Sequence, residues 1–99
     1  MSAVVVRYRV KPGRAEENAA LVRAVYAQLA ERRPPGFRYA TFALEDELTF
    51  VHIAFGGDAE NVSLTDLPAF KEFQRGLPER CDESPQVTRL TSPVGSYGF

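Results

Sequence analysis

The chain has 99 residues, of which 44% are hydrophobic, and it carries 12 basic and 13 acidic side chains. This length predicts one domain, residues 1–99, built around a single core. The balanced charge argues against nucleic-acid binding, which needs basic charge gathered on one face. No apolar run approaches the roughly 18 residues of a membrane span. One cysteine cannot form an intramolecular disulfide.

A strand is predicted over residues 4–10, where β-branched side chains alternate around Tyr8. It begins almost at once, which leaves no room for a signal peptide, so we expect a cytoplasmic protein. Pro12 and Gly13 end the strand. A helix follows from about residue 14 to residue 32, with an apolar stripe at Leu21, Val22, Val25 and Leu29.

Two strands of a hairpin are predicted next, over residues 37–44 and 48–55, around the polar turn 45–47. In the second of these strands His52 shares a face with Phe50, Leu48 and Ala54. The opposite face is apolar too, with Val51, Ile53 and Phe55.

The last elements are a helix over residues 67–81 and an extended segment over residues 87–99, with a loop at 82–85 between them. Gly76 and Pro78 predict a break in the helix near Leu77. The order β-α-β-β-α-β is that of the ferredoxin-like α+β fold. We therefore expect a four-stranded antiparallel sheet with two helices on one face.

Both faces of the predicted sheet are rich in apolar side chains, although helices cover only one of them. In a chain of this size, the simplest cover for the second face is another copy of the same chain. The sequence therefore predicts a homodimer whose sheets face each other. Pro93 and Gly95 suit an edge or an arm that reaches onto the partner.

Three segments resemble the antibiotic biosynthesis monooxygenase family of the dimeric α+β barrel superfamily. They are residues 4–13, which end in Val-Lys-Pro-Gly, residues 49–54 and residues 67–73. The resemblance covers nearly the whole chain, and it implies that two sheets pair face to face into a barrel with the helices outside. It also implies a small hydrophobic or aromatic ligand, because the family includes cofactor-free oxygenases of polycyclic phenols and quinols.

The function that this resemblance favours is a cofactor-independent monooxygenase-like enzyme for an aromatic or polyketide-type small molecule. One alternative is a non-catalytic ligand-binding or dimeric scaffold protein. Another is an isomerase or cyclase of the lactone type. A shared fold does not decide between them. We expect no cofactor, and the missing Trp argues against the haem-degrading members of the superfamily.

His52, the only histidine, is the candidate catalytic residue, since imidazole titrates near neutral pH and can act as a general base. The alternative is a histidine satisfied in the core or at a dimer interface. A single histidine without carboxylates at ligand spacing does not make a metal site, so no metal is expected.

Four further residues are candidates for substrate binding: Asn18, Tyr26, Arg38 and Tyr39. Asn18 falls near the centre of the apolar stripe of the first helix, where an amide needs a hydrogen-bond partner. That partner could equally be water or a loop carbonyl. Tyr26 and Tyr39, like Tyr8, could line a cavity or simply pack in the core, and Arg38 could meet an anion or form a salt bridge. Cys81 continues a buried stripe and is expected to be inert.

Overall fold

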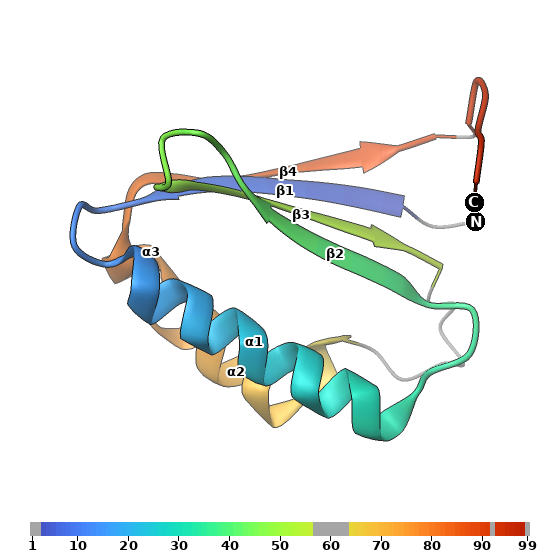
Figure 1. Cartoon of the computed structure of the whole chain (residues 1–99), viewed down its shortest axis with the longest axis horizontal. Coiled ribbons are helices and arrows are strands. Elements are labelled where there is room, and N and C mark those ends of the chain that lie inside the picture. Colours follow the sequence, from blue (N-terminus) through green and yellow to red (C-terminus); the bar gives the residue numbers. More distant parts are fainter. Residues whose placement is uncertain (1–2, 57–63, 92, 99) are drawn as a thin grey trace.

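The protein, seen in a computed structural model, is described at residues 3–56, 64–91 and 93–98. Its elements, shown in Figure 1, follow the predicted order of an α+β ferredoxin-like fold. In chain order they are β1 (Ala3–Val10), α1 (Ala15–Arg32), β2 (Arg38–Ala43), β3 (Thr49–Phe55), the 3-10 turn η1 (Leu64–Asp66), α2 (Pro68–Arg75), α3 (Leu77–Arg80) and β4 (Cys81–Leu90).

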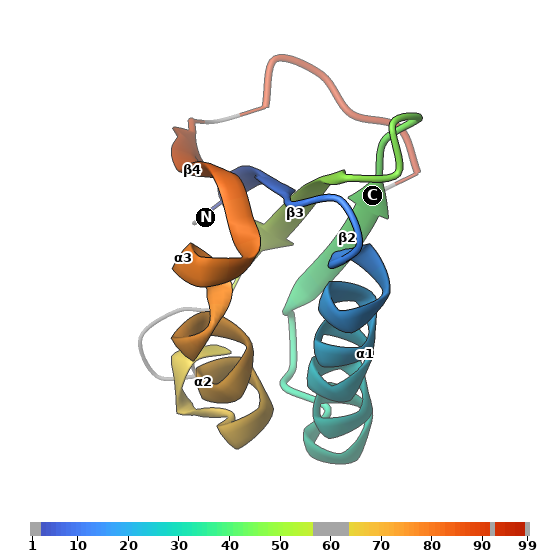
Figure 2. The same cartoon turned by 90° about the vertical axis from the view of Figure 1, so that its left-hand side faces the viewer.

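The four strands form one antiparallel sheet in the order β2-β3-β1-β4. Figure 2 shows α1 and α2 side by side on the same face of this sheet, as the sequence predicted. None of the described helices lies on the other face. The segment after β4 runs on past the sheet, and both termini lie at the same end of it (Figure 1).

The second predicted helix is broken where expected. α2 ends at Arg75, Gly76 separates it from α3, and Pro78 lies in the first turn of α3, where its missing N–H costs no hydrogen bond. Pro68 likewise occupies the first turn of α2. The cap of α2 is Leu67, which makes no side-chain cap bond.

The last strand differs from the prediction at both ends. The segment 82–85 is not a loop, because β4 begins at Cys81, which pairs with Val10 of β1. Between the pairs Arg7–Gln86 and Arg9–Glu83, two residues of β4 stand opposite one residue of β1, a bulge that accommodates Pro85. β4 ends at Leu90, so the predicted extension to residue 99 is wrong for the described residues beyond it.

The core lies between the helices and the sheet. Tyr8 and Val10 of β1 meet Val22 and Val25 of α1, and Phe73 of α2 closes the layer. α1 buries one stripe, in which Asn18 precedes Val22 and Val25 at helical spacing. The predicted apolar stripe is therefore correct, and its polar member is buried with it.

Candidate functional site

A cavity of about 590 Å³ lies between the sheet and α2. This volume falls in the range of small-molecule sites. Apolar side chains from three strands and α2 form most of its wall, among them Val6, Ala54, Phe70, Phe73 and Val87. The polar residues on the wall are Tyr8, Tyr39, His52, Thr65 and Gln74. The cavity therefore suits a mostly apolar molecule with few polar groups.

His52 is held between two tyrosine hydroxyls on this wall. Its Nε2 atom lies 2.7 Å from the hydroxyl oxygen of Tyr8, and its Nδ1 atom lies 2.5 Å from that of Tyr39. The hydroxyl of Thr41 lies 3.2 Å from the same Nδ1 atom and 2.8 Å from the hydroxyl of Tyr26. Alternation along β1, β2 and β3 brings these side chains to the helix-covered face at adjacent register positions.

Behind Tyr8 the same row of hydrogen bonds continues away from the cavity. The Asn18 side-chain NH₂ donates to the Tyr8 hydroxyl at 2.8 Å, and Arg80 Nε donates to Asn18 Oδ1 at 3.2 Å. Arg80 also donates to the backbone carbonyl of Phe73 at 2.9 Å, and its guanidinium lies 5.3 Å from the centre of the Phe73 ring. Asn18 is fully buried and Arg80 is 1% exposed.

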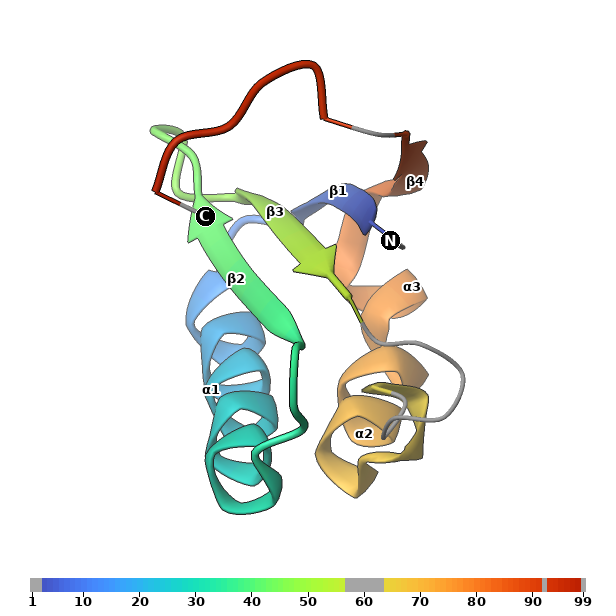
Figure 3. The ribbon, with the colours of Figure 1, turned by 90° about the vertical axis from the view of Figure 1, so that its right-hand side faces the viewer.

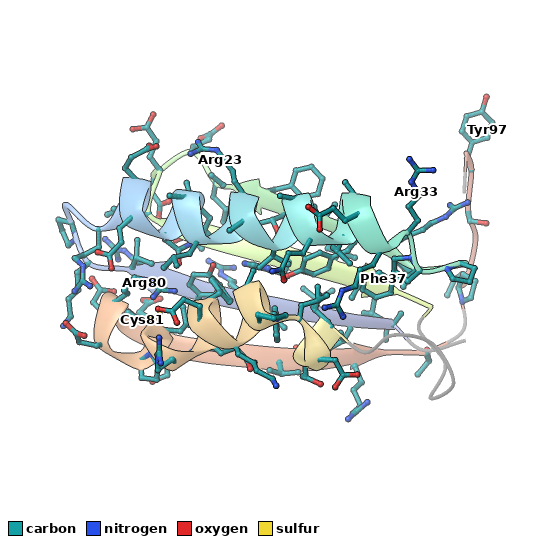
Figure 4. The ribbon with its side chains drawn as sticks, turned by 90° about the horizontal axis from the view of Figure 1, so that it is seen from below. Arg23, Arg33, Phe37, Arg80, Cys81 and Tyr97 are labelled. Atoms are coloured by element: carbon teal, nitrogen blue, oxygen red, sulfur yellow. The ribbon has the colours of Figure 1, made fainter. Side chains whose placement is uncertain are left out.

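Arg80 is a buried cation of an unusual kind. Among the residues that the structure describes, no carboxylate lies within ion-pair distance of its guanidinium. Figure 4 shows Arg80 at the junction of α1 with the helix that leads into β4. Hydrogen bonds and the ring of Phe73 make the direct contacts to its charge, a costly arrangement for stability alone.

The Arg80 guanidinium determines which group donates and which accepts in each hydrogen bond of this row. A guanidinium can only donate, so it fixes the Asn18 oxygen toward Arg80 and the Asn18 NH₂ toward Tyr8. The Tyr8 hydroxyl accepts that bond, which leaves its own proton to donate to His52 Nε2. His52 is thereby assigned as the neutral tautomer that carries its proton on Nδ1 and donates it toward Tyr39.

Burial also keeps these groups uncharged at neutral pH. Desolvation lowers the pKa of His52 to about 4, so the imidazole is a neutral base. Desolvation raises the pKa of the Tyr8 and Tyr39 hydroxyls, although the hydrogen bond from Asn18 and the charge of Arg80 act in the opposite direction on Tyr8. The polar side chains on the cavity wall are thus uncharged, and the nearest charge described above is that of Arg80 behind Tyr8 and Asn18.

The structure brings some of the residues predicted from sequence together and separates others. His52 and Tyr39 line the cavity, and the Tyr26 ring stacks on that of Tyr39 at 5.2 Å. Asn18 does not line the cavity and contacts Tyr8 instead. Arg38 does not line it either, since it alternates with Tyr39 along β2 and so points to the other face of the sheet.

Sequence reasoning missed Arg80. The signal was present in its spacing, because Arg80 follows Phe73 by seven residues and Leu77 by three, which places it on the buried side of its helix. A charged residue in the last turn is more often a solvent-exposed partner of the helix dipole.

Cys81, predicted to be a buried thiol, is buried at the start of β4, and desolvation raises its pKa. Within the described residues, no group of three or more His, Cys, Asp or Glu side chains is placed to hold a metal ion. The same residues include no helix long and apolar enough to span a membrane.

Comparison with models of known protein families gave no match, and neither did comparison with curated protein sequences. Solved structures do match. One named antibiotic biosynthesis monooxygenase has a TM-score of 0.74 at 16% identity, over 94% of this chain and 99% of the other. Rv0793 from Mycobacterium tuberculosis has a TM-score of 0.77 at 17% identity, over 97% and 98%.

A third match is a mutant of SnoaB, a cofactor-independent oxygenase from Streptomyces nogalater. Its TM-score is 0.69 at 19% identity, over 99% of this chain and 97% of that chain. At such low identity the likeness concerns the fold and not the reaction. The resemblance predicted from sequence is thus confirmed at the level of the fold: this chain is built like proteins named antibiotic biosynthesis monooxygenases.

Proposed function

We propose that the protein is a cofactor-independent monooxygenase-like enzyme that oxidises an aromatic or polyketide-type small molecule with O₂. The observation that carries this proposal is a neutral histidine on the wall of an apolar cavity, hydrogen-bonded on both nitrogens to tyrosine hydroxyls. Such a wall can take a proton from a phenol-like ligand in mostly apolar surroundings. The fold shared with a named cofactor-independent oxygenase supports the same proposal.

The proton path follows from the direction of the row. A ligand O–H in the cavity gives its proton to the Tyr8 oxygen, while the proton that Tyr8 already donates moves to His52 Nε2. The ligand becomes an anion and His52 an imidazolium. Desolvation lowers the pKa of His52, and the negative charge of the ligand anion raises it again. The ligand anion and the imidazolium therefore stabilise each other.

Asn18 and Arg80 are positioning residues in this proposal. The Asn18 NH₂ holds the Tyr8 oxygen in place, and Arg80 holds the Asn18 amide. The guanidinium also favours negative charge on Tyr8 during the transfer, since its charge lowers the Tyr8 pKa against the larger, raising effect of burial. A buried cation without a carboxylate partner is useful where negative charge develops only during reaction.

The oxidation itself is the chemistry of the ligand anion with O₂. The anion gives one electron to O₂, and the two radicals combine at a ring carbon to form a peroxide anion. The proton held by His52 returns through Tyr8 to this anion and gives the hydroperoxide. Loss of water from this carbon leaves a carbonyl, so a CH₂ group and O₂ become C=O and H₂O. One oxygen atom enters the ligand and the other leaves as water.

The test uses a dihydroxyanthrone as probe, with O₂ uptake and quinone formation measured together. We expect His52→Phe and Tyr8→Phe each to lower kcat by about 10² or more. Arg23→Ala is the matched control, because Arg23 is exposed on α1 and pairs with Glu16 away from the cavity (Figure 4). Its rate should equal that of the unaltered protein.

The alternatives are outcomes of the same test. Binding without O₂ uptake, together with proton exchange on the ligand that His52→Phe abolishes, would indicate an isomerase or cyclase. Absence of any binding or turnover across a series of phenols would contradict the proposal and favour a scaffold protein.

We also propose that the protein acts as a homodimer with the sheets face to face. The open face carries Val51 and Ile53 at its centre, and Phe42 on β2 is 56% exposed. The same face carries Arg7 on β1, so an identical face can meet it with apolar contacts at the centre and polar groups around them. Val94 and Tyr97 are exposed and supply an arm for the partner, and Figure 4 shows Tyr97 standing away from the sheet.

A further inference from the structure

A second hollow lies next to the first and shares one wall with it. It measures about 280 Å³ and lies between the end of α1 and the start of β2. Its lining includes Tyr26, Leu29, Ala30, Arg33, Phe37 and Tyr39. Among the described residues, Tyr39 is the one side chain that lines both hollows. Its ring therefore borders each of them.

We propose that Tyr39 limits the length of the ligand that the main cavity accepts, because its ring closes that cavity against the second hollow. The inference rests on the proposed function, since it concerns ring-containing ligands of the same cavity. With Tyr39 in place, the cavity takes a short ring system. With the Tyr39 ring shortened or displaced, the two hollows become one slot that takes a longer, linearly fused ring system.

The contacts of Tyr39 fit a partition that is positioned but not locked. Its ring stacks with those of Tyr26 and Phe37, with centroids at 5.2 and 5.9 Å and interplanar angles of 23° and 22°. Its hydroxyl meets His52 at 2.5 Å. Its strand, β2, is at the edge of the sheet, and the side chain is only partly buried. Stacking and one hydrogen bond thus hold a ring on an edge strand.

The chemistry of the second hollow matches a further aromatic ring. Figure 3 shows β2 running beside α1, and Figure 4 shows Phe37 turned inward beneath the end of α1 while Arg33 stands out beyond it. A ligand ring that took the place of the Tyr39 ring would stack with Tyr26 and Phe37 as Tyr39 does.

The experiment measures dissociation constants for a series of hydroxylated quinones with two, three and four linearly fused rings, by quenching of protein fluorescence. The variant Tyr39→Leu shortens the partition, and Tyr39→Phe is the matched control that keeps the ring and removes only the hydroxyl. We expect Tyr39→Leu to lower the ratio of the four-ring to the two-ring constant at least tenfold. Tyr39→Phe should leave this ratio within twofold of the unaltered protein.

A double variant locates the effect. Ala30 lines only the second hollow, so adding Ala30→Phe to Tyr39→Leu fills the new space and should restore the original ratio. If Tyr39→Leu does not fold, Tyr39→Met replaces it in the single and in the double variant, because methionine keeps a longer side chain. The proposal is wrong if shortening Tyr39 changes all the constants equally, or if Tyr39→Phe changes the ratio as much.

Failure of the proposed function has a different signature. If the unaltered protein binds no member of the series, the ligand class is wrong, and the partition is then tested by crystals of the Tyr39→Leu variant under xenon. Xenon along one continuous slot supports the partition. Xenon confined to two separate hollows, or a collapsed second hollow, overturns it.

Discussion

The two faces of the sheet depart from the usual pattern in opposite directions. The layer between the helices and the sheet, where an apolar core is expected, holds a row of polar groups from Arg80 of α3 through Asn18 of α1 to Tyr8 and His52 of the sheet. The open face, where water is expected, carries Val51 and Ile53. Each departure indicates a partner of matching chemistry: a ligand with a polar group in the cavity, and an apolar protein surface on the open side.

The inner face gives the largest expected effect on stability. Asn18→Leu removes the acceptor of Arg80 and leaves a buried guanidinium nitrogen without its partner. We expect the free energy of unfolding to fall by about 1–3 kcal/mol, the range for a buried donor left without its hydrogen-bond partner. Urea denaturation measures it, with Arg23→Leu on the exposed side of α1 as control. Equal losses in the two variants would show that the buried row adds nothing.

The open face gives the next effect, on assembly. Ile53→Lys places a charge at the centre of the proposed dimer interface, opposite Val5 in the sheet register. We expect the dimer dissociation constant to rise about 100-fold, equivalent to about 2.7 kcal/mol. Sedimentation measures it, and Ala20→Lys on exposed α1 adds the same charge elsewhere. If the unaltered protein is monomeric at micromolar concentration, the proposed dimer is wrong.

The neutral histidine predicts a pH dependence of stability. Because burial lowers the pKa of His52 from 6.5 to about 4, its contribution is complete above pH 6.5 and is lost as the pH falls toward 4. The free energy of unfolding should fall by up to roughly 1.4 kcal/mol per pH unit across this window. His52→Phe should lack this part of the slope. Identical slopes in both proteins would place the histidine in a solvated environment.

The smallest expected effect on stability is in the β2–β3 turn, away from the cavity and from the proposed dimer interface. The Asp46 carboxylate accepts bonds from the Leu48 and Thr49 backbone N–H groups and the Thr49 hydroxyl, and the Thr49 bonds chiefly lower its pKa, to about 2. Its contribution is present above pH 3.8 and is lost as the pH approaches 2. Asp46→Asn should therefore be less stable at pH 7 and equally stable at pH 2. A gap that persists at pH 2 would point to another cause.

Most of the helices and strands could be predicted from the sequence, because they depend on local patterns. Alternation and helical spacing placed the elements, and Gly76 placed the break between α2 and α3. The start of β4 could not be predicted in this way. Pro85 reads as a loop residue, and only pairing with the distant β1 makes it part of a bulged strand.

The site was predictable only in part for a similar reason. His52 and Asn18 stood out because each is a polar residue at an apolar position of its own element. Their partners are 44 and 62 residues away in the chain, so spacing along one element cannot identify Tyr8 or Arg80. The partners become visible when the helix and the strands share one layer.

The central claim is that His52 is a neutral base, oriented by Arg80 and open to a ligand in the cavity. His52 is the only histidine, so ¹⁵N-labelled imidazole gives one pair of resonances. We predict that the free protein at pH 7 carries its proton on Nδ1 alone, and that a bound phenol shifts the Nε2 resonance. A rapidly averaged pair of tautomers, or resonances that no phenol moves, would contradict the account.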